Sequence, residues 1–220
     1  MLERQLRVIA LDNRGAGDSD KPDLPYTTAL MAEDALAVLA AAGEESAHWF
    51  GISLGGMIAQ QIALARPGAV RSLILVATHC GDNQGEAGGT QLEALKGNPL
   101  ARYSNLYSTN FILERAAWVS EDARHFGKMP LHAIHRQDQA VRSHHTCGRL
   151  KAITEPVLII HGRQDRMVSA ERAEEMAAVL PHAELAILDP AGHQVHSEQF
   201  TRVVELVLAF VRRVETTREG

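Results

Sequence analysis

The chain has 220 residues, of which 45% are hydrophobic and 22% are charged. This length and composition are typical of one globular domain with a small insertion, and they exclude a disordered or collagen-like chain. The 22 Lys and Arg residues against 27 Asp and Glu residues give a net charge of −5. Because the sequence has no basic stripe, we expect no nucleic-acid partner.

Targeting signals and cysteines point to the same class of protein. No apolar run reaches the roughly 18–20 residues that a membrane span requires, so we expect no membrane partner. The first residues lack the pattern of a signal peptide. Cys80 and Cys147 do not have metal-site spacing, and a secreted disulfide scaffold would carry more cysteines. We interpret Cys80 as a small packing residue and predict a cytoplasmic protein.

The first 80 residues alternate between apolar runs with strand character and runs with helical periodicity. Leu6–Leu11 is short, apolar and bounded by turn residues, which predicts a buried strand. An amphipathic helix follows and ends at Gly43. The next predicted elements are a strand, a helix and a strand over Ala47–Phe50, Leu54–Ala65 and Val70–Ala77. This alternation favours a parallel sheet with helices on its faces, which is the α/β class.

The pattern changes in the middle of the chain and returns near its end. Residues 81–150 begin with a glycine-rich stretch and continue with two helical runs, Ser104–Val119 and Glu121–Arg149, without a strand signal. From Pro156 on, the alternation resumes with a strand, a helix, a strand and a helix, at Val157–His161, Ala170–Leu180, Ala183–Leu188 and Gln199–Arg213. We therefore predict a core formed by residues 1–80 and 151–220 and a small helical cap over residues 81–150.

A Gly-x-Ser-x-Gly pattern lies where a predicted strand turns into a helix. Gly51-Ile52-Ser53-Leu54-Gly55 places the serine on a tight turn, in the arrangement called a nucleophile elbow. Side chains two residues on either side would collide there, so we expect Gly51 and Gly55 to be required. The Leu54 N–H, at the helix N-terminus, would then face an oxyanion forming on a substrate.

A serine nucleophile needs a base, and the base needs an orienting carboxylate. Asp165 follows the predicted strand Val157–Ile160, and His193 follows the strand Ala183–Leu188. Because the carboxyl ends of parallel strands share one edge of the sheet, Ser53, Asp165 and His193 are predicted to converge. Two alternatives remain open, Asp82 as the acid and His196 as the base.

The histidines of the predicted cap raise the question of a metal site. His132 and His135 share one face of a predicted helix, which is compatible with a metal site. No cysteine or carboxylate has matching spacing, so we favour an ordinary helix face. We predict no metal and no organic cofactor.

These motifs, in this order, resemble the serine hydrolases of the α/β-hydrolase fold. Asp12-Asn13-Arg14-Gly15-Ala16-Gly17-Asp18-Ser19 resembles the loop after the family's strand four, where Arg14 and Asp18 are read as structural. The resemblance places Ser53 at the nucleophile, Asp165 at the acid and His193 at the base. Gly56-Met57-Ile58-Ala59-Gln60 is most similar to small enol-lactonases, carboxylesterases and cofactor-free perhydrolases. Haloalkane dehalogenases and epoxide hydrolases are disfavoured because their elbows carry Asp.

The resemblance has one departure, at the start of the sequence. The family fold begins with three strands and a His-Gly loop that supplies the other oxyanion N–H. Leu6–Leu11 already matches strand four, so the first strands of the family fold are missing from this sequence. Three alternatives are open: Leu6–Leu11 pairs directly with Ala47–Phe50, another chain donates a strand, or the sequence is an N-terminally truncated form of a longer protein. An unfilled sheet would favour association, so a homo-oligomer is one expectation.

The leading functional hypothesis is hydrolysis of a small ester, lactone or related acyl substrate through an acyl-enzyme on Ser53. The same groups could also carry out perhydrolysis or hydrolysis of a carbon–carbon bond. The alternative is a catalytically weak or inactive pseudoenzyme that binds a small ligand or a partner, since losing one oxyanion donor costs about 10²–10³ in rate.

Overall fold

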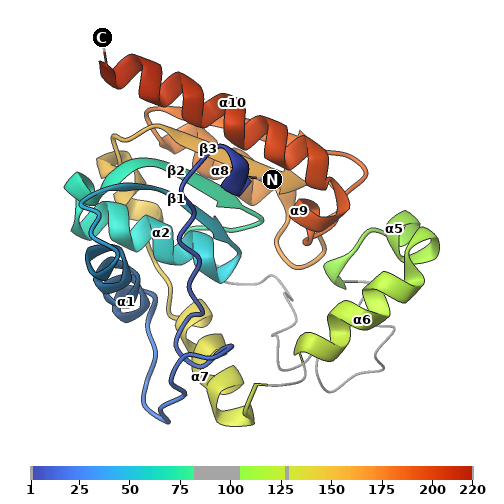
Figure 1. Cartoon of the computed structure of the whole chain (residues 1–220). Helices are drawn as coiled ribbons and strands as arrows, with labels where there is room; N and C mark the ends of the chain where they lie inside the picture. Colours follow the sequence, from blue (N-terminus) through green and yellow to red (C-terminus); the bar gives the residue numbers. More distant parts are fainter. Residues whose placement is uncertain (1, 82–104, 127–128, 220) are drawn as a thin grey trace.

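A parallel sheet of four strands forms the centre of the molecule (Figure 1). The computed structural model describes residues 2–81, 105–126 and 129–219. The strands are β1 (Ala47–Ile52), β2 (Val70–Val76), β3 (Val157–Gly162) and β4 (Ala183–Leu188), in the spatial order β1-β2-β3-β4. All three pairings are parallel. The predicted α/β class with helices on a parallel sheet is confirmed.

Helices cover both faces of this sheet, as Figure 1 shows. One face packs against α1 (Thr28–Ala41), α2 (Leu54–Ala65) and α8 (Ala170–Val179), and the other against α9 (Val195–Glu198) and α10 (Phe200–Glu219). Successive strand residues point to opposite faces. Leu73 and Leu75 therefore lie in the first core, whereas Ile74 and Val76 lie in the second. The central strands β2 and β3 are mostly apolar because both of their faces are buried.

The first helix begins and ends where its sequence signals predict. The Thr27 side chain accepts a hydrogen bond from the Leu30 backbone N–H at 3.0 Å, which caps the N-terminus of α1. Gly43, with φ of +78°, follows its C-terminus in the left-handed conformation that favours glycine. A 3₁₀ turn, η2 (Pro67–Ala69), ends α2 before β2. No helix within the described ranges is both long and apolar enough to cross a membrane.

The described part of residues 81–150 is helical, in agreement with the predicted class of its elements. It contains α5 (Thr109–Glu114), α6 (Ala116–Phe126), α7 (Leu131–Arg142) and the 3₁₀ helix η3 (Cys147–Ala152). One continuous helix over Glu121–Arg149 is wrong, because α7 starts only after Pro130. Proline has no N–H and disfavours a helical residue before it. The division of the chain into core and cap remains a prediction.

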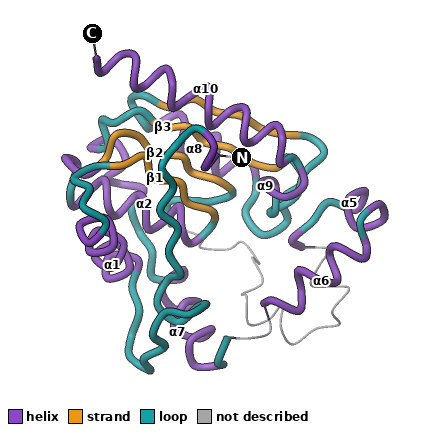
Figure 2. Tube along the Cα trace, viewed as in Figure 1, coloured by secondary structure: helices purple, strands orange, loops and turns teal. Residues whose placement is uncertain are grey.

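The predicted strand over Leu6–Leu11 is wrong. Residues 6–11 form no ladder with β1, and Figure 2 draws them as a loop, in teal, that leads away from the 3₁₀ helix η1 (Leu2–Arg4). Val8 is 51% exposed. Leu2 and Leu6 instead pack beside the second core. An apolar run is buried as a strand only where a neighbouring strand pairs with it.

The two cysteines form a disulfide, which the sequence spacing does not indicate. Cys80, after β2, is bonded to Cys147 at the start of η3, 67 positions away in sequence. The interpretation of Cys80 as a packing residue is therefore incomplete: it packs against the core and is also cross-linked. Because disulfides persist mainly in oxidising compartments, the cysteines no longer support a cytoplasmic location, which stays a prediction.

Candidate active site

Ser53 occupies the sharp turn between β1 and α2. Its backbone has φ of +51° and ψ of −115°, a conformation that non-glycine residues rarely adopt and that costs on the order of 1–3 kcal/mol. Two contacts to β2 and its following turn hold it there. The Ser53 N–H donates to the Val76 carbonyl at 2.8 Å, and the Thr78 hydroxyl donates to the Ser53 carbonyl at 2.7 Å.

Two glycines make room for this turn, but they are not the two that the sequence pattern singles out. A Cβ on Gly51 would lie 2.2 Å from the Gly55 carbonyl oxygen, so glycine is required at position 51. A Cβ on Gly55 would meet no atom within 4 Å beyond its own helix and chain neighbours. The second close approach is at Gly56, where a Cβ would lie 2.5 Å from the Thr78 side chain. The steric role predicted for Gly55 therefore belongs to Gly56.

The start of α2 leaves backbone donors beside Ser53. Leu54 is the first residue of this helix, and the first N–H groups of a helix have no partner within it. The Gly56 N–H turns back to the Ser53 carbonyl at 2.9 Å. The Leu54 N–H is thus available at the positive end of the helix dipole, where it can stabilise a developing negative charge.

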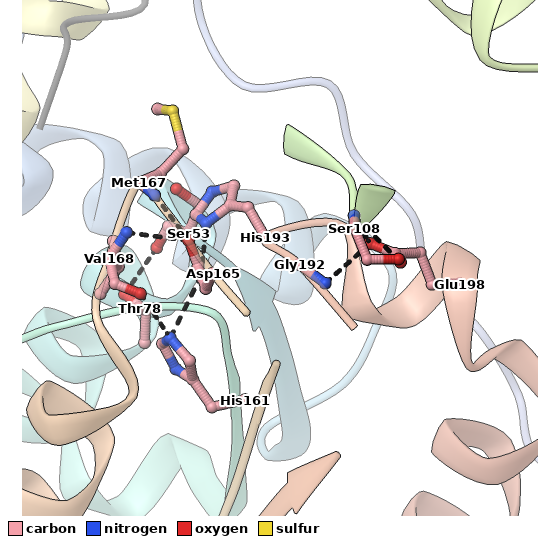
Figure 3. Close-up of polar contacts among 10 residues, drawn as sticks. All are labelled: Ser53, Thr78, Ser108, His161, Asp165, Met167, Val168, Gly192, His193 and Glu198. Carbon is pink, nitrogen blue, oxygen red and sulfur yellow. Dashed lines mark hydrogen bonds and ion pairs between the residues drawn. The ribbon is translucent and has the colours of Figure 1, made fainter. Parts of the chain in front are cut away.

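Asp165 lies on the loop after β3 and receives hydrogen bonds on both carboxylate oxygens (Figure 3). Its Oδ1 accepts from the backbone N–H groups of Met167 at 2.8 Å and Val168 at 2.9 Å. Its Oδ2 lies 2.8 Å from His193 Nδ1 and 3.2 Å from His161 Nε2. Four nitrogen donors around one buried carboxylate fix its position.

This environment keeps Asp165 ionised. Burial alone would raise the pKa of its carboxyl, but the electrostatic influence of the adjacent His193 and the hydrogen bonds from His161 and His193 more than offset burial. The pKa of Asp165 therefore lies well below its usual range. An ionised carboxylate only accepts hydrogen bonds, so it requires the proton of His193 on Nδ1 and leaves Nε2 as the free base.

The structure brings the predicted acid and histidine into direct contact and puts the predicted serine at the same edge of the sheet. Ile52, directly before Ser53, is in register with Val76 of β2. Val76 pairs in turn with Ile160, near the end of β3. Of the two candidate bases, His193 is the one with a hydrogen bond to Asp165, at 2.8 Å. The alternative acid, Asp82, lies outside the described residues.

Two side chains around this cluster were not predicted as site residues. His161 Nε2 lies 2.9 Å from the Val168 carbonyl as well as near Asp165, and its ring is fully buried. Glu198 accepts a hydrogen bond from the Gly192 N–H, next to His193, at 2.8 Å. The signals available in the sequence are the spacing of His161 four residues before Asp165 and that of Glu198 five residues after His193.

The cap histidines behave differently from the predicted metal alternative. His132 Nε2 lies 2.9 Å from the Lys21 carbonyl, so it fastens α7 to the N-terminal loop. Among the residues that the structure describes, no three His, Cys, Asp or Glu side chains gather in a way that could hold a metal ion.

Two further histidines lie in the core near the disulfide. His144 Nδ1 lies 2.9 Å from the Thr28 hydroxyl, and its Nε2 lies 3.2 Å from the Thr146 hydroxyl. Burial lowers the pKa of His144 to about 3 and that of His79 to about 4. Both rings are therefore neutral at pH 7.

Comparisons with known proteins agree with this fold. A family profile described as the alpha/beta hydrolase fold matches residues 1–200. The chain is 28% identical over 219 residues to a Stutzerimonas stutzeri protein provisionally named carbamate hydrolase RutD, covering 92% of this chain and 82% of that protein. It is 26% identical over 220 residues to the 3-oxoadipate enol-lactonase 1 of Acinetobacter baylyi, covering 97% and 82%.

A solved structure has the same fold. The crystal structure of a hydrolase from Pseudomonas aeruginosa superimposes with a TM-score of 0.85 at 29% sequence identity. The match covers 96% of this chain and 81% of that one. The similarity therefore extends over nearly all of the present sequence.

Proposed function

Because the chain belongs to the alpha/beta hydrolase fold family, we propose that it is a serine hydrolase in which Ser53, His193 and Asp165 act as nucleophile, base and acid. The observation that carries the proposal is the 2.8 Å contact between His193 Nδ1 and the ionised Asp165, at the sheet edge where the strained Ser53 lies. A neutral imidazole with its Nδ1 proton held in this way is a base poised on its other nitrogen.

The reaction proceeds in two halves. His193 Nε2 takes the Ser53 hydroxyl proton as Oγ attacks the substrate carbonyl, and the oxyanion is stabilised by the Leu54 N–H. The imidazolium, stabilised by Asp165, then protonates the leaving oxygen and an acyl-enzyme remains. Water attacks this ester with His193 again as base, which releases the acid and restores Ser53.

Small carboxylic esters and lactones are the substrate class that we favour. The similarity to an enol-lactonase over 97% of the chain supports a lactone or ester carbonyl. The similarity to a protein named as a carbamate hydrolase adds carbamates as a related acyl class. All three present a carbonyl next to a heteroatom leaving group, which the same serine chemistry cleaves.

A fluorophosphonate probe tests the proposal directly. We expect the wild-type chain to gain the mass of one phosphonyl group and Ser53→Ala to gain none. Ser53→Ala should also reduce turnover of p-nitrophenyl acetate and a small γ-lactone by at least about 10³-fold. Labelling of both chains to the same extent, or of neither, would contradict the proposal.

One observation favours a second candidate, a weakly active or inactive protein that binds a ligand. β1 forms an edge of the sheet, and within the described ranges no further strand pairs with it. A second oxyanion N–H from a strand-end loop on that side of Ser53 is therefore not available from the sheet. Measurable ester turnover that is abolished in His193→Ala would exclude this candidate.

A further inference from the structure

A carboxylate outside the Ser53–His193–Asp165 set joins the loop that carries His193 to the segment that enters α5. Glu198, the last residue of α9, accepts the Gly192 N–H on Oε1 at 2.8 Å. The Ser108 N–H lies 3.1 Å from Oε1 and 3.2 Å from Oε2, and the Ser108 hydroxyl also bonds to Oε2. Figure 3 shows Glu198 between Gly192 and Ser108.

Both residues that Glu198 binds occupy positions of consequence. Gly192 directly precedes His193, so its placement fixes where the imidazole begins. Ser108 is the N-cap of α5, and its hydroxyl accepts a hydrogen bond from the Phe111 N–H at 3.3 Å. If the Glu198 carboxylate moves, we therefore expect both the backbone before His193 and the N-terminus of α5 to move with it.

Residues 106–108 also contact the histidine loop without Glu198. The Gln194 N–H donates to the Leu106 carbonyl at 2.9 Å. A Cβ on Gly192 would lie 2.8 Å from the Tyr107 carbonyl carbon, so the two backbones touch. Both neighbours of His193 are therefore tied to residues 106–108. Gln194 is bonded to Leu106 directly, and Gly192 is linked to Ser108 through Glu198.

We propose that Glu198 is a positioning residue for His193, and that it makes the alignment of the base depend on the seating of residues 106–108. The role rests on the proposed serine hydrolase function. A misplacement of about 1 Å in a reacting group costs on the order of 10²-fold in rate, so a small movement of this loop is enough to matter.

The chemistry of the three donors explains why a carboxylate is needed. Two N–H groups and one O–H group converge on Glu198, and an ionised carboxylate offers only acceptors. A glutamine at position 198 has nearly the same shape, but it has no charge and its NH₂ group would replace one acceptor oxygen. The Ser108 hydroxyl would then have to accept instead of donate, and the remaining hydrogen bonds to residue 198 would lose their charge assistance, while the packing around α9 changes little.

Glu198→Gln tests the proposal, with Glu205→Gln as the matched control on α10. Glu205 is exposed, and its carboxylate pairs with the exposed Arg202 at 3.4 Å. We expect Glu198→Gln to lower kcat for a small ester by about 10- to 100-fold with KM changed by less than about twofold. Glu205→Gln should leave both unchanged. Equal kcat in the two variants, or a change confined to KM, would overturn the proposal.

A second readout does not depend on turnover. In ¹⁵N-histidine-labelled protein, we expect a slowly exchanging low-field Nδ1–H signal from His193, assigned by its loss in His193→Ala. Glu198→Gln should broaden this signal or speed its exchange, whereas Glu205→Gln should not. An unchanged signal in Glu198→Gln overturns the positioning role even if the wild-type chain hydrolyses no ester. If the wild-type chain hydrolyses no ester but the His193 signal is perturbed in Glu198→Gln, the proposed function is contradicted and the positioning role is not.

Ser108→Ala tests the same proposal if Glu198→Gln does not fold. This variant removes one donor and leaves both backbone bonds to Glu198 in place. We expect the same direction of change at a smaller size, about threefold to tenfold in kcat. If Glu198→Gln does not fold, an unchanged kcat and an unchanged His193 signal in Ser108→Ala overturn the proposal.

Discussion

The serine half and the acid–histidine half of the candidate site are held in place by different means. Ser53 is positioned by backbone geometry, with a positive φ that Gly51 and Gly56 make sterically feasible. Asp165 and His193 are held by polar contacts, with four donor groups on the Asp165 carboxylate and three on that of Glu198. The first half is therefore sensitive to added volume, and the second to the loss of one hydrogen-bonding atom.

Replacing one oxygen should break the polar half with the largest effect. Asp165→Asn keeps the shape of the side chain but removes the charge and one acceptor, so the His193 tautomer is no longer enforced. We expect ester turnover to fall by about 10³- to 10⁴-fold. The steady-state rate checks this, with the exposed Asp189→Asn as control. A loss of less than tenfold would mean that Asp165 does not orient the base.

Adding one carbon should break the serine half. The Cβ of Gly51→Ala would overlap the Gly55 carbonyl, so the turn must shift at a cost of about 2–3 kcal/mol. Gly55→Ala is the matched control, because its Cβ enters open space, and we expect it to cost less than about 1 kcal/mol. Urea unfolding measures both. Similar losses in the two variants would refute the assignment of the steric role to Gly51.

A smaller, pH-dependent effect on the free energy of unfolding is expected from His144, which lies outside the candidate site. Because the pKa of His144 is lowered from 6.5 to about 3 on folding, the unfolded chain binds more protons between these values. The contribution of the neutral His144 to the free energy of unfolding is therefore fully present above about pH 6.5 and is lost as the pH falls toward 3. Between pH 6.5 and 5, this effect lowers the free energy of unfolding by about 2 kcal/mol.

The matched pair for this effect is His144→Gln and His145→Gln. The His145 side chain is exposed, whereas that of His144 is buried. We expect His144→Gln to flatten the curve of unfolding free energy against pH more than His145→Gln does. Parallel curves for the wild type and His144→Gln would show that folding does not lower the pKa of His144.

The sequence was sufficient where local pattern and topology reinforce each other. Ser53, Asp165 and His193 each follow a strand, and parallel strands bring their carboxyl ends to one edge, so shared placement could be predicted without coordinates. The contact between Asp165 and His193 extends this prediction to atomic detail.

The misses arise where a residue's role is set by a partner distant in sequence. Leu6–Leu11 has the composition of a buried strand, but only a pairing neighbour makes a strand, and β1 does not pair with it. Cys80 finds Cys147 across 67 positions. Glu198 acquires its role through Ser108, 90 positions earlier. Gly56 differs from Gly55 only because Thr78 lies beside it.

The disulfide between Cys80 and Cys147 joins the two ends of the segment that lies between them. Helices α5, α6 and α7 all lie within the covalently closed loop between the two cysteines. A protease cut within α5 or α6 would therefore leave two fragments still attached, with β1 and β2 on one and β3 and β4 on the other. Such a nicked molecule should run as a single species until a thiol reductant is added, and then as two.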